Sequence, residues 1–146
     1  MAKDWIEIQA QPLSVERAWA FLNDGSAGGT AFFLGTTRAA RNEQGRELLA
    51  LIYEAYAEMA AKQLADFARR ARERWPVVKL VLLHRMGRVE VGEPSVLVGV
   101  STPHRGDAFE ACRWLIDTLK ADAAIWKQEV WQDAPPTWVH PAGDGE

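Results

Sequence analysis

The length, composition and charge of this chain restrict its class before any motif is considered. Its 146 residues are 48% hydrophobic and 25% charged, which fits one globular domain, residues 1–146, with a buried core. The net charge of −3 excludes a globally basic surface for nucleic acid or an anionic membrane, and no run of about 18 apolar residues offers a transmembrane helix. The N-terminal segment lacks the apolar part of a secretory signal, and Cys112 is the single cysteine, so we expect a cytoplasmic protein.

Hydrophobic patterns divide the first half of the chain into strands and helices. Residues 5–9 alternate as in a half-buried strand, and Ser14 stands at the N-cap position of a short amphipathic segment. Pro76 ends a longer segment with helical periodicity. The patterns predict strands at 5–9, 30–37 and 48–56, helices at 15–22 and 58–75, and a mobile, arginine-containing loop at 38–46.

The second half of the chain combines buried strands with one long helix. Asp107 is expected to begin this helix, with Glu110 at the capping-box position. Its buried face is expected to hold the residues that recur at helical spacing, namely Phe109, Cys112, Leu115, Ile116 and Leu119. The predicted strands are 77–84, 95–101 and 126–131, with short extended segments at 87–91 and 135–139. Helices and strands mix without strict alternation, which indicates the α+β class.

One candidate site is the segment His104-Arg105, which follows a buried strand and precedes the last helix. Free backbone N–H groups, the positive end of a helix and a guanidinium would meet there, and together they suit a phosphate or carboxylate. An exposed turn with a solvated arginine explains the same residues equally well. The spacing leaves both interpretations open.

A second candidate is the pair Lys120 and Lys127, at the end of the last helix and the start of the next strand. The simple interpretation of Lys120 is that a lysine at a helix C-terminus complements the helix dipole. The functional interpretation is that two amines face one pocket, where they bind an anion or act as acid, base or nucleophile.

The remaining polar residues provide weaker signals. Arg38, Arg41 and Arg46 lie in the loop at 38–46, which is either solvated or a segment that closes over a ligand. For His84-Arg85 we expect a structural role, because no helix follows the pair. No spacing typical of metal ligands, nucleotide-binding loops or dinucleotide-binding turns is present, so we expect neither a metal nor a cofactor.

Taken in order, the motifs resemble the large, catalytic subunit family of molybdopterin synthase. The resemblance runs from about Phe33 to Glu129 and rests on Gly35-Thr-Thr-Arg38, Tyr53-Glu54-Ala-Tyr56, His84-Arg85-Met-Gly87, Val91-Gly92-Glu93, His104-Arg105-Gly-Asp and Ile125-Trp126-Lys127. It implies an α/β hammerhead with an additional small β subdomain. It also implies a sulfurtransferase that converts cyclic pyranopterin monophosphate into the dithiolene of molybdopterin, in molybdenum cofactor biosynthesis.

The resemblance further implies partners and roles for particular residues. Sulfur would arrive as a thiocarboxylate on the C-terminus of a small ubiquitin-like subunit, and the large subunit would form a homodimer with one small subunit at each end. Lys120 corresponds to the family's essential catalytic lysine and Lys127 to its companion. The substrate-binding residues carried over by motif are Thr36, Thr37, Arg38, His104, Arg105, Lys120, Lys127, Gln128 and Glu129. A non-catalytic dimeric module that binds a phosphorylated metabolite is the alternative, and a scaffold for the ubiquitin-like partner is a third interpretation.

Two positions depart from the family pattern. Ala124 stands where proline is usual, so we expect a looser turn before Lys127, and Thr37 replaces an apolar residue. Two further expectations come from the residues themselves. Cys112 lies on a buried helical stripe and should carry no sulfur. Arg105 and Lys120 are separated by roughly 20 Å of helix, so a site that uses both should be shared between two protomers.

Overall fold

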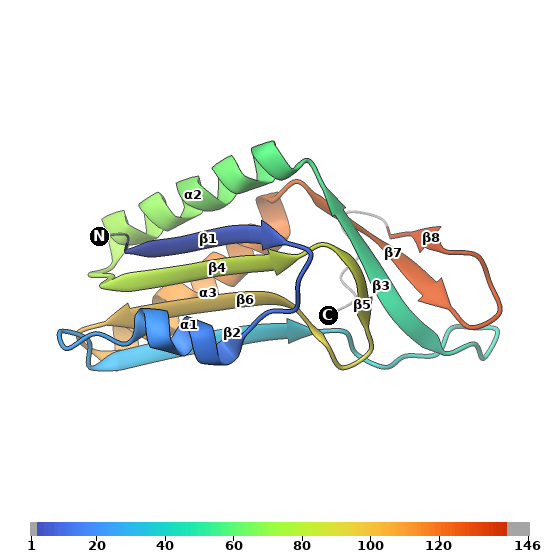
Figure 1. Ribbon diagram of the computed structural model, residues 1–146, viewed down its shortest axis with the longest axis horizontal. Coiled ribbons are helices and arrows are strands. Elements are labelled where there is room, and N and C mark those ends of the chain that lie inside the picture. The colour runs from blue at the N-terminus through green and yellow to red at the C-terminus, as the bar shows by residue number, and fades with distance from the viewer. Residues whose placement is uncertain (1–2, 140–146) are drawn as a thin grey trace.

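Two apolar runs form the centre of the larger of two β-sheets. In the computed structural model, which describes residues 3–139, β4 (Lys79–Arg85) pairs antiparallel with β6 (Pro94–Thr102), and all but the first residue of β6 is buried. β1 (Asp4–Gln9) adds in parallel to β4, and β2 (Gly29–Thr36) adds antiparallel to β6. The strand order is therefore β1-β4-β6-β2 (Figure 1).

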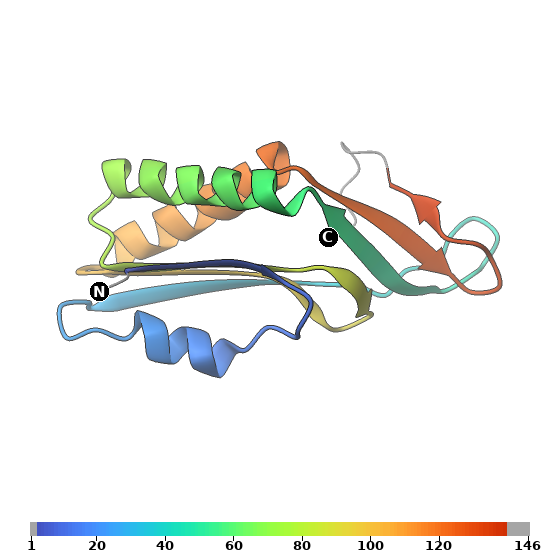
Figure 2. The same cartoon turned by 45° about the horizontal axis from the view of Figure 1, so that its top comes forward.

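Helices lie on both faces of this sheet. α2 (Ala57–Arg74) and α3 (Arg105–Asp122) cover one face, and the short α1 (Val15–Leu22) covers part of the other (Figure 2). The alternation of strand side chains explains this, because Leu82 joins the core under α2 and α3 while Val81 joins the core under α1. Among residues 3–139, no helix is both long enough and apolar enough to cross a membrane.

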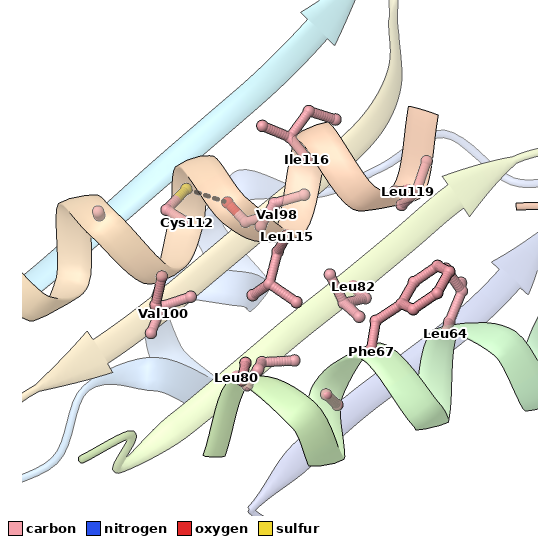
Figure 3. Packing of buried hydrophobic residues seen from close by; sticks show 14 of the residues in the cluster. Leu64, Phe67, Leu80, Leu82, Val98, Val100, Cys112, Leu115, Ile116 and Leu119 are labelled. Carbon is pink, nitrogen blue, oxygen red and sulfur yellow. Dashed lines mark hydrogen bonds between the residues drawn. The ribbon is translucent and has the colours of Figure 1, made fainter. Parts of the chain in front are cut away.

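The core under α2 and α3 confirms most of the expected buried face of the last helix. Cys112, Leu115, Ile116 and Leu119 are all buried there (Figure 3). The prediction for Phe109 is wrong, because this side chain is 65% exposed. Phe109 projects about 90° away from the middle of the buried stripe at 100° per residue. The small residues Ala108 and Ala111 face the sheet instead.

The start of α3 also differs from the prediction. The helix begins at Arg105 with His104 as its N-cap, two residues before Asp107, and no side chain caps it. The hydroxyl of Thr102 donates to the carbonyl oxygen of His104 at 2.5 Å, which turns the chain directly from β6 into the helix. The predicted capping box at Asp107 and Glu110 is therefore wrong. By contrast, Ser14 caps α1 as expected, since its Oγ accepts from the N–H of Arg17 at 3.1 Å.

A second, smaller sheet continues from one end of the first. Its strands are β5 (Gly87–Glu90), β3 (Leu48–Ala55), β7 (Ile125–Trp131) and the two-residue β8 (Thr137–Trp138), in the order β5-β3-β7-β8. It has a small core of its own, formed by Leu48, Leu51, Tyr53 and Val89. This arrangement confirms the predicted α+β class with a separate small β unit, and the predicted elements agree with the observed ends within about two residues.

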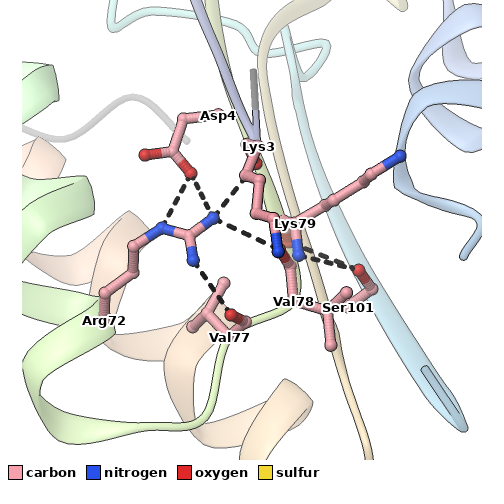
Figure 4. Close-up of polar contacts among 7 residues, drawn as sticks. All are labelled: Lys3, Asp4, Arg72, Val77, Val78, Lys79 and Ser101. Atoms are coloured by element: carbon pink, nitrogen blue, oxygen red, sulfur yellow. Dashed lines mark hydrogen bonds and ion pairs between the residues drawn. The ribbon is translucent and has the colours of Figure 1, made fainter. Parts of the chain in front are cut away.

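A half-buried guanidinium connects the N-terminal strand to the helical layer. Arg72 of α2 contacts one carboxylate oxygen of Asp4 at 2.6 and 3.0 Å and donates to the carbonyl oxygens of Lys3, Val77 and Val78 (Figure 4). The side chains of Arg72 and Asp4 are only 28% and 31% exposed. One side chain therefore satisfies several backbone acceptors at the start of β1 and just before β4.

Replacing Arg72 tests how much this contact contributes. Arg72→Ala should lower the free energy of unfolding by about 2 kcal/mol, because it removes the guanidinium donor from a partly buried carboxylate and from the carbonyl oxygens of Val77 and Val78. Urea unfolding at neutral pH measures the change. Arg69→Ala is the matched control on the same helix, since the Arg69 side chain is 60% exposed and pairs with Asp66 and Glu73 at the surface. Equal losses for the two variants would contradict this account.

Candidate functional site

The two lysines singled out in the sequence lie on either side of a very short connection. Lys120 is in the last turn of α3, and Lys127 is in β7, opposite Tyr53 of β3. Only Ala123 and Ala124 separate the end of the helix from the start of the strand. The end of α3 and the start of β7 meet at the corner between the helical layer and the small sheet (Figure 1). Both lysines therefore lie near this corner.

The corner is held by hydrogen bonds, although Ala124 was expected to loosen it. The N–H of Ala123 donates to the carbonyl oxygen of Leu119 at 3.0 Å, and that of Ile125 donates to Ala123 at 2.9 Å. The side chain of Gln63, from α2, contacts the same turn. Sequence analysis missed Gln63, because a contact across 61 positions leaves no local pattern.

Arg38 follows the end of β2. Thr36 is the last residue of that strand and is exposed, as is Arg38. Thr37 between them is only 2% exposed, and its backbone bonds to Glu93 and Gly92 at 3.2 and 2.8 Å. Its role as a substrate contact stays a prediction. The structure shows that Thr37 anchors the segment that carries Arg38.

The other two arginines of the predicted mobile loop contact nearby groups. Arg41 pairs with Glu47 at 2.8 Å, and a bridge between these two residues closes the base of the loop. Arg46 donates to the carbonyl oxygens of Gln132 and Asp133, just beyond β7. Arg38 is thus the arginine of this segment that the structure leaves best placed to meet a ligand.

The second basic cluster lies at the other end of α3. His104 and Arg105 are exposed at its N-terminus, where no side chain occupies the first-turn N–H groups as a cap. Glycines bring the start of β2 against them, since a Cβ on Gly29 would lie 2.7 Å from the Cα of Arg105. Exposed basic side chains and free N–H groups at one helix end suit an anion.

The two clusters are therefore kept apart by the helix. β2 and α3 both begin near Gly29 and Arg105 and run toward the small sheet (Figure 2). Arg38 consequently lies toward the Lys120 end, while His104 and Arg105 lie at the opposite end. The fifteen positions from Arg105 to Lys120 correspond to about 22 Å along the helix axis.

The remaining predicted contacts divide between the two faces of β7. Side chains alternate along a strand, so Lys127 and Glu129 project to one face and Gln128 to the other. Gln128 pairs in register with Ile52 and Trp138, and Glu129 with Leu51 and Thr137. The structure thus places Glu129, rather than Gln128, on the face that Lys127 uses.

Of the two residues expected to be structural, His84 is buried and Arg85 is half-buried. His84 is 4% exposed and its ring contacts that of Tyr53 edge-on, with centroids 4.9 Å apart. Arg85 pairs with Glu93 at 3.4 Å and its side chain is 14% exposed. Within the part of the chain that the structure describes, no group of three or more His, Cys, Asp or Glu residues is placed to hold a metal ion.

Fold and site together define an α+β protein with a basic cluster at each end of one helix, a class suited to an anionic small molecule. The chain belongs to the MoaE protein family, which matches residues 8–122. It is 42% identical to the molybdopterin synthase catalytic subunit of Nostoc sp., over 94% of this chain and 82% of the relative. It is 37% identical to that of Homo sapiens, over 94% of this chain and 71% of the relative.

Solved structures agree with this assignment. Molybdopterin synthase from Staphylococcus aureus superposes with a TM-score of 0.85 at 33% identity, over 92% of this chain and 96% of that one. A protein–protein complex of subunits 1 and 2 of molybdopterin-converting factor from Helicobacter pylori shares the fold, with a TM-score of 0.70 at 22% identity, over 94% of this chain and 90% of that one.

Cys112 provides a test of the burial described above. Burial raises the pKa of its thiol to about 11, and the sulfur lies 3.8 Å from the carbonyl oxygen of Val98 in the core. At pH 8 the reactive thiolate is therefore scarce, and iodoacetamide should leave the folded protein unmodified while it alkylates the urea-unfolded protein fully. Intact-mass measurement follows the reaction. Stoichiometric alkylation of the folded protein would contradict the inert role.

Proposed function

We propose that this chain transfers sulfur from the C-terminal thiocarboxylate of a small ubiquitin-like subunit to cyclic pyranopterin monophosphate, forming the dithiolene of molybdopterin. The family membership and the names of the relatives support this reaction. The structural observation that best supports this location for the active site is that Lys120 and Lys127 lie on either side of a two-residue turn. Two flexible amines near one corner can serve both proton transfer and anion binding.

In this mechanism the thiocarboxylate sulfur attacks a side-chain carbon of the pterin, where a C–O bond breaks and the oxygen leaves as water. Water then cleaves the acyl–sulfur bond, so that the sulfur stays on the pterin and the small subunit leaves as a carboxylate. Lys120 handles proton transfer or forms a covalent bond to a carbonyl group. Lys127 binds anionic groups next to Lys120. Cys112 is 6% exposed in the core, which supports an external sulfur donor rather than a persulfide on the chain itself.

The substrate is proposed to be held by basic groups from both ends of α3. Arg38, with Thr36 and Thr37, would contact it near the lysines, and Gln128 and Glu129 continue the strand that carries Lys127. His104 and Arg105 would bind the phosphate through charge-assisted hydrogen bonds and the free N–H groups of the helix start.

Helix length supports a site that takes residues from two protomers. A pterin phosphate is much shorter than the roughly 22 Å between the backbones of Arg105 and Lys120 along α3, which argues against one molecule using both ends of the same helix. A homodimer that brings the start of one α3 near the end of its partner removes this conflict. We therefore propose that His104 and Arg105 act on the substrate held by the partner's Lys120.

The small-subunit partner is proposed on related grounds. The Helicobacter pylori structure of the same fold is a complex of two subunits of molybdopterin-converting factor. The corner with Lys120 and Lys127 would receive the C-terminal tail of such a partner. Neither a nucleic acid nor a membrane is part of the proposal.

Lys120→Ala tests the catalytic claim. With thiocarboxylated small subunit and the pterin precursor, this variant should lose at least about hundredfold in turnover, because proton transfer or the covalent step has no amine. Dithiolene formation is the readout, and pterin binding is measured in parallel. Lys62→Ala, which removes an exposed lysine of α2, is the matched control and should turn over normally. If the wild-type protein shows no turnover and Lys120→Ala only weakens pterin binding, the non-catalytic binding module is favoured instead.

Mixing variants tests the shared site. Arg105→Ala and Lys120→Ala homodimers should each be impaired, whereas a mixed dimer contains one site with both wild-type residues. After subunit exchange, proven by mass-tagged protomers, activity should recover to as much as about half the wild-type value for each mixed dimer. No recovery in mixed dimers that have demonstrably formed would show that each site is complete within one protomer.

A further inference from the structure

The side chain of Gln63 joins α2 to the turn between the two lysines. Its Nε2 donates to the carbonyl oxygen of Asp122 at 3.0 Å, and its Oε1 accepts from the N–H of Ala124 at 2.7 Å. Both polar ends of one amide are therefore bonded to residues two positions apart in the backbone. This two-point contact fixes the orientation of the turn as well as its position.

Gln63 itself is carried by a rigid part of the fold. Its neighbours on α2, Leu64 and Phe67, are 0% and 3% exposed in the main core. The helix cannot rotate or slide without disturbing that core, since close-packed interiors resist displacement. The side-chain amide of Gln63 therefore connects the turn to the helix that packs on the larger sheet.

The turn needs such a contact for chemical reasons. Asp122 ends α3, so its carbonyl oxygen is one of the last four of the helix, which have no partner inside the helix. Ala123 and Ala124 have no side chains long enough to hold the turn themselves. Without Gln63, the backbone hydrogen bonds donated by Ala123 and Ile125 would remain, but neither involves Asp122 or Ala124.

We propose that Gln63 is a positioning residue that sets the placement of Lys120 relative to Lys127. Lys120 lies two residues before one bonded group, and Lys127 lies three residues after the other. A change in the turn angle therefore moves one amine relative to the other. This inference rests on the proposed roles of the two lysines and assigns Gln63 no contact with the substrate.

Gln63→Ala should reduce kcat about tenfold, because small misplacements of reacting groups have large effects on rate. KM for the pterin should change less than kcat, since His104 and Arg105 at the far end of α3 are untouched. Gln132→Ala, the same truncation at an exposed position, is the control and should keep the wild-type kcat. Rates are normalised to the folded fraction, determined by urea unfolding, so that a loss of stability alone does not count.

A double-mutant cycle separates positioning from general structural support. If Gln63 acts through the lysine pair, Gln63→Ala should have almost no further effect on kcat in a Lys127→Ala background. Independent effects that multiply would overturn the proposal. So would a Gln63→Ala protein whose kcat stays within about twofold of wild type.

Proline at position 124 offers a rescue. Proline has no N–H that would be left without a partner, and Ala123 already has the extended conformation that a residue before proline prefers, with φ −72° and ψ 140°. Gln63→Ala combined with Ala124→Pro should therefore recover most of the lost kcat. A folded double variant that stays as slow as Gln63→Ala would mean that the amide does more than hold the turn, and would overturn the proposal.

These results are distinguishable from failure of the proposed site. If Lys120→Ala and Lys127→Ala both keep full turnover, the lysine site is wrong and Gln63 has nothing to position. If the lysine variants are impaired while Gln63→Ala is not, only the role of Gln63 is wrong.

Discussion

The packing of α3 against the larger sheet is the constraint on which the site depends. Ala108, Ala111 and Leu115 lie against the strands, so the helix is held along its length and its two ends are kept far apart. One end presents His104 and Arg105, and the other carries Lys120 toward the small sheet. The two basic clusters of the proposed site are thus separated by a rigid helix. The homodimer that we propose would bring clusters from two protomers together.

The corner where the helical layer meets the small sheet has the opposite requirement, because there α2, α3 and β7 must stay close together. Two residues connect α3 to β7, and α2 reaches the connection through Gln63. Arg38 follows β2 at the same end of the larger sheet, where buried Thr37 anchors the backbone. α2, α3 and β7 therefore meet at this corner, which is where we propose that the partner's C-terminal tail and the pterin bind.

Local patterns in the sequence predicted the elements well, whereas contacts between elements were mostly out of reach. The alternating and apolar runs located the strands, and the helical stripe correctly identified the burial of Cys112. The same stripe failed for Phe109, because two alanines let the helix approach the sheet and turned the larger side chain outward. Likewise, the sequence does not distinguish the three arginines of the loop. In the structure Arg41 pairs with Glu47, and Arg46 donates to the carbonyl oxygens of Gln132 and Asp133. Gln63 had no local signal, since its partners lie about sixty positions away.

The central claim is that one substrate is bound by opposite ends of two α3 helices. A crystal structure of the protein with the pterin phosphate bound tests it most directly. The account predicts a dimer in which the phosphate contacts Arg105 of one protomer while the pterin lies beside Lys120 of the other. A substrate whose protein contacts all come from a single chain, with the ends of the partner's α3 remote from it, would contradict the account.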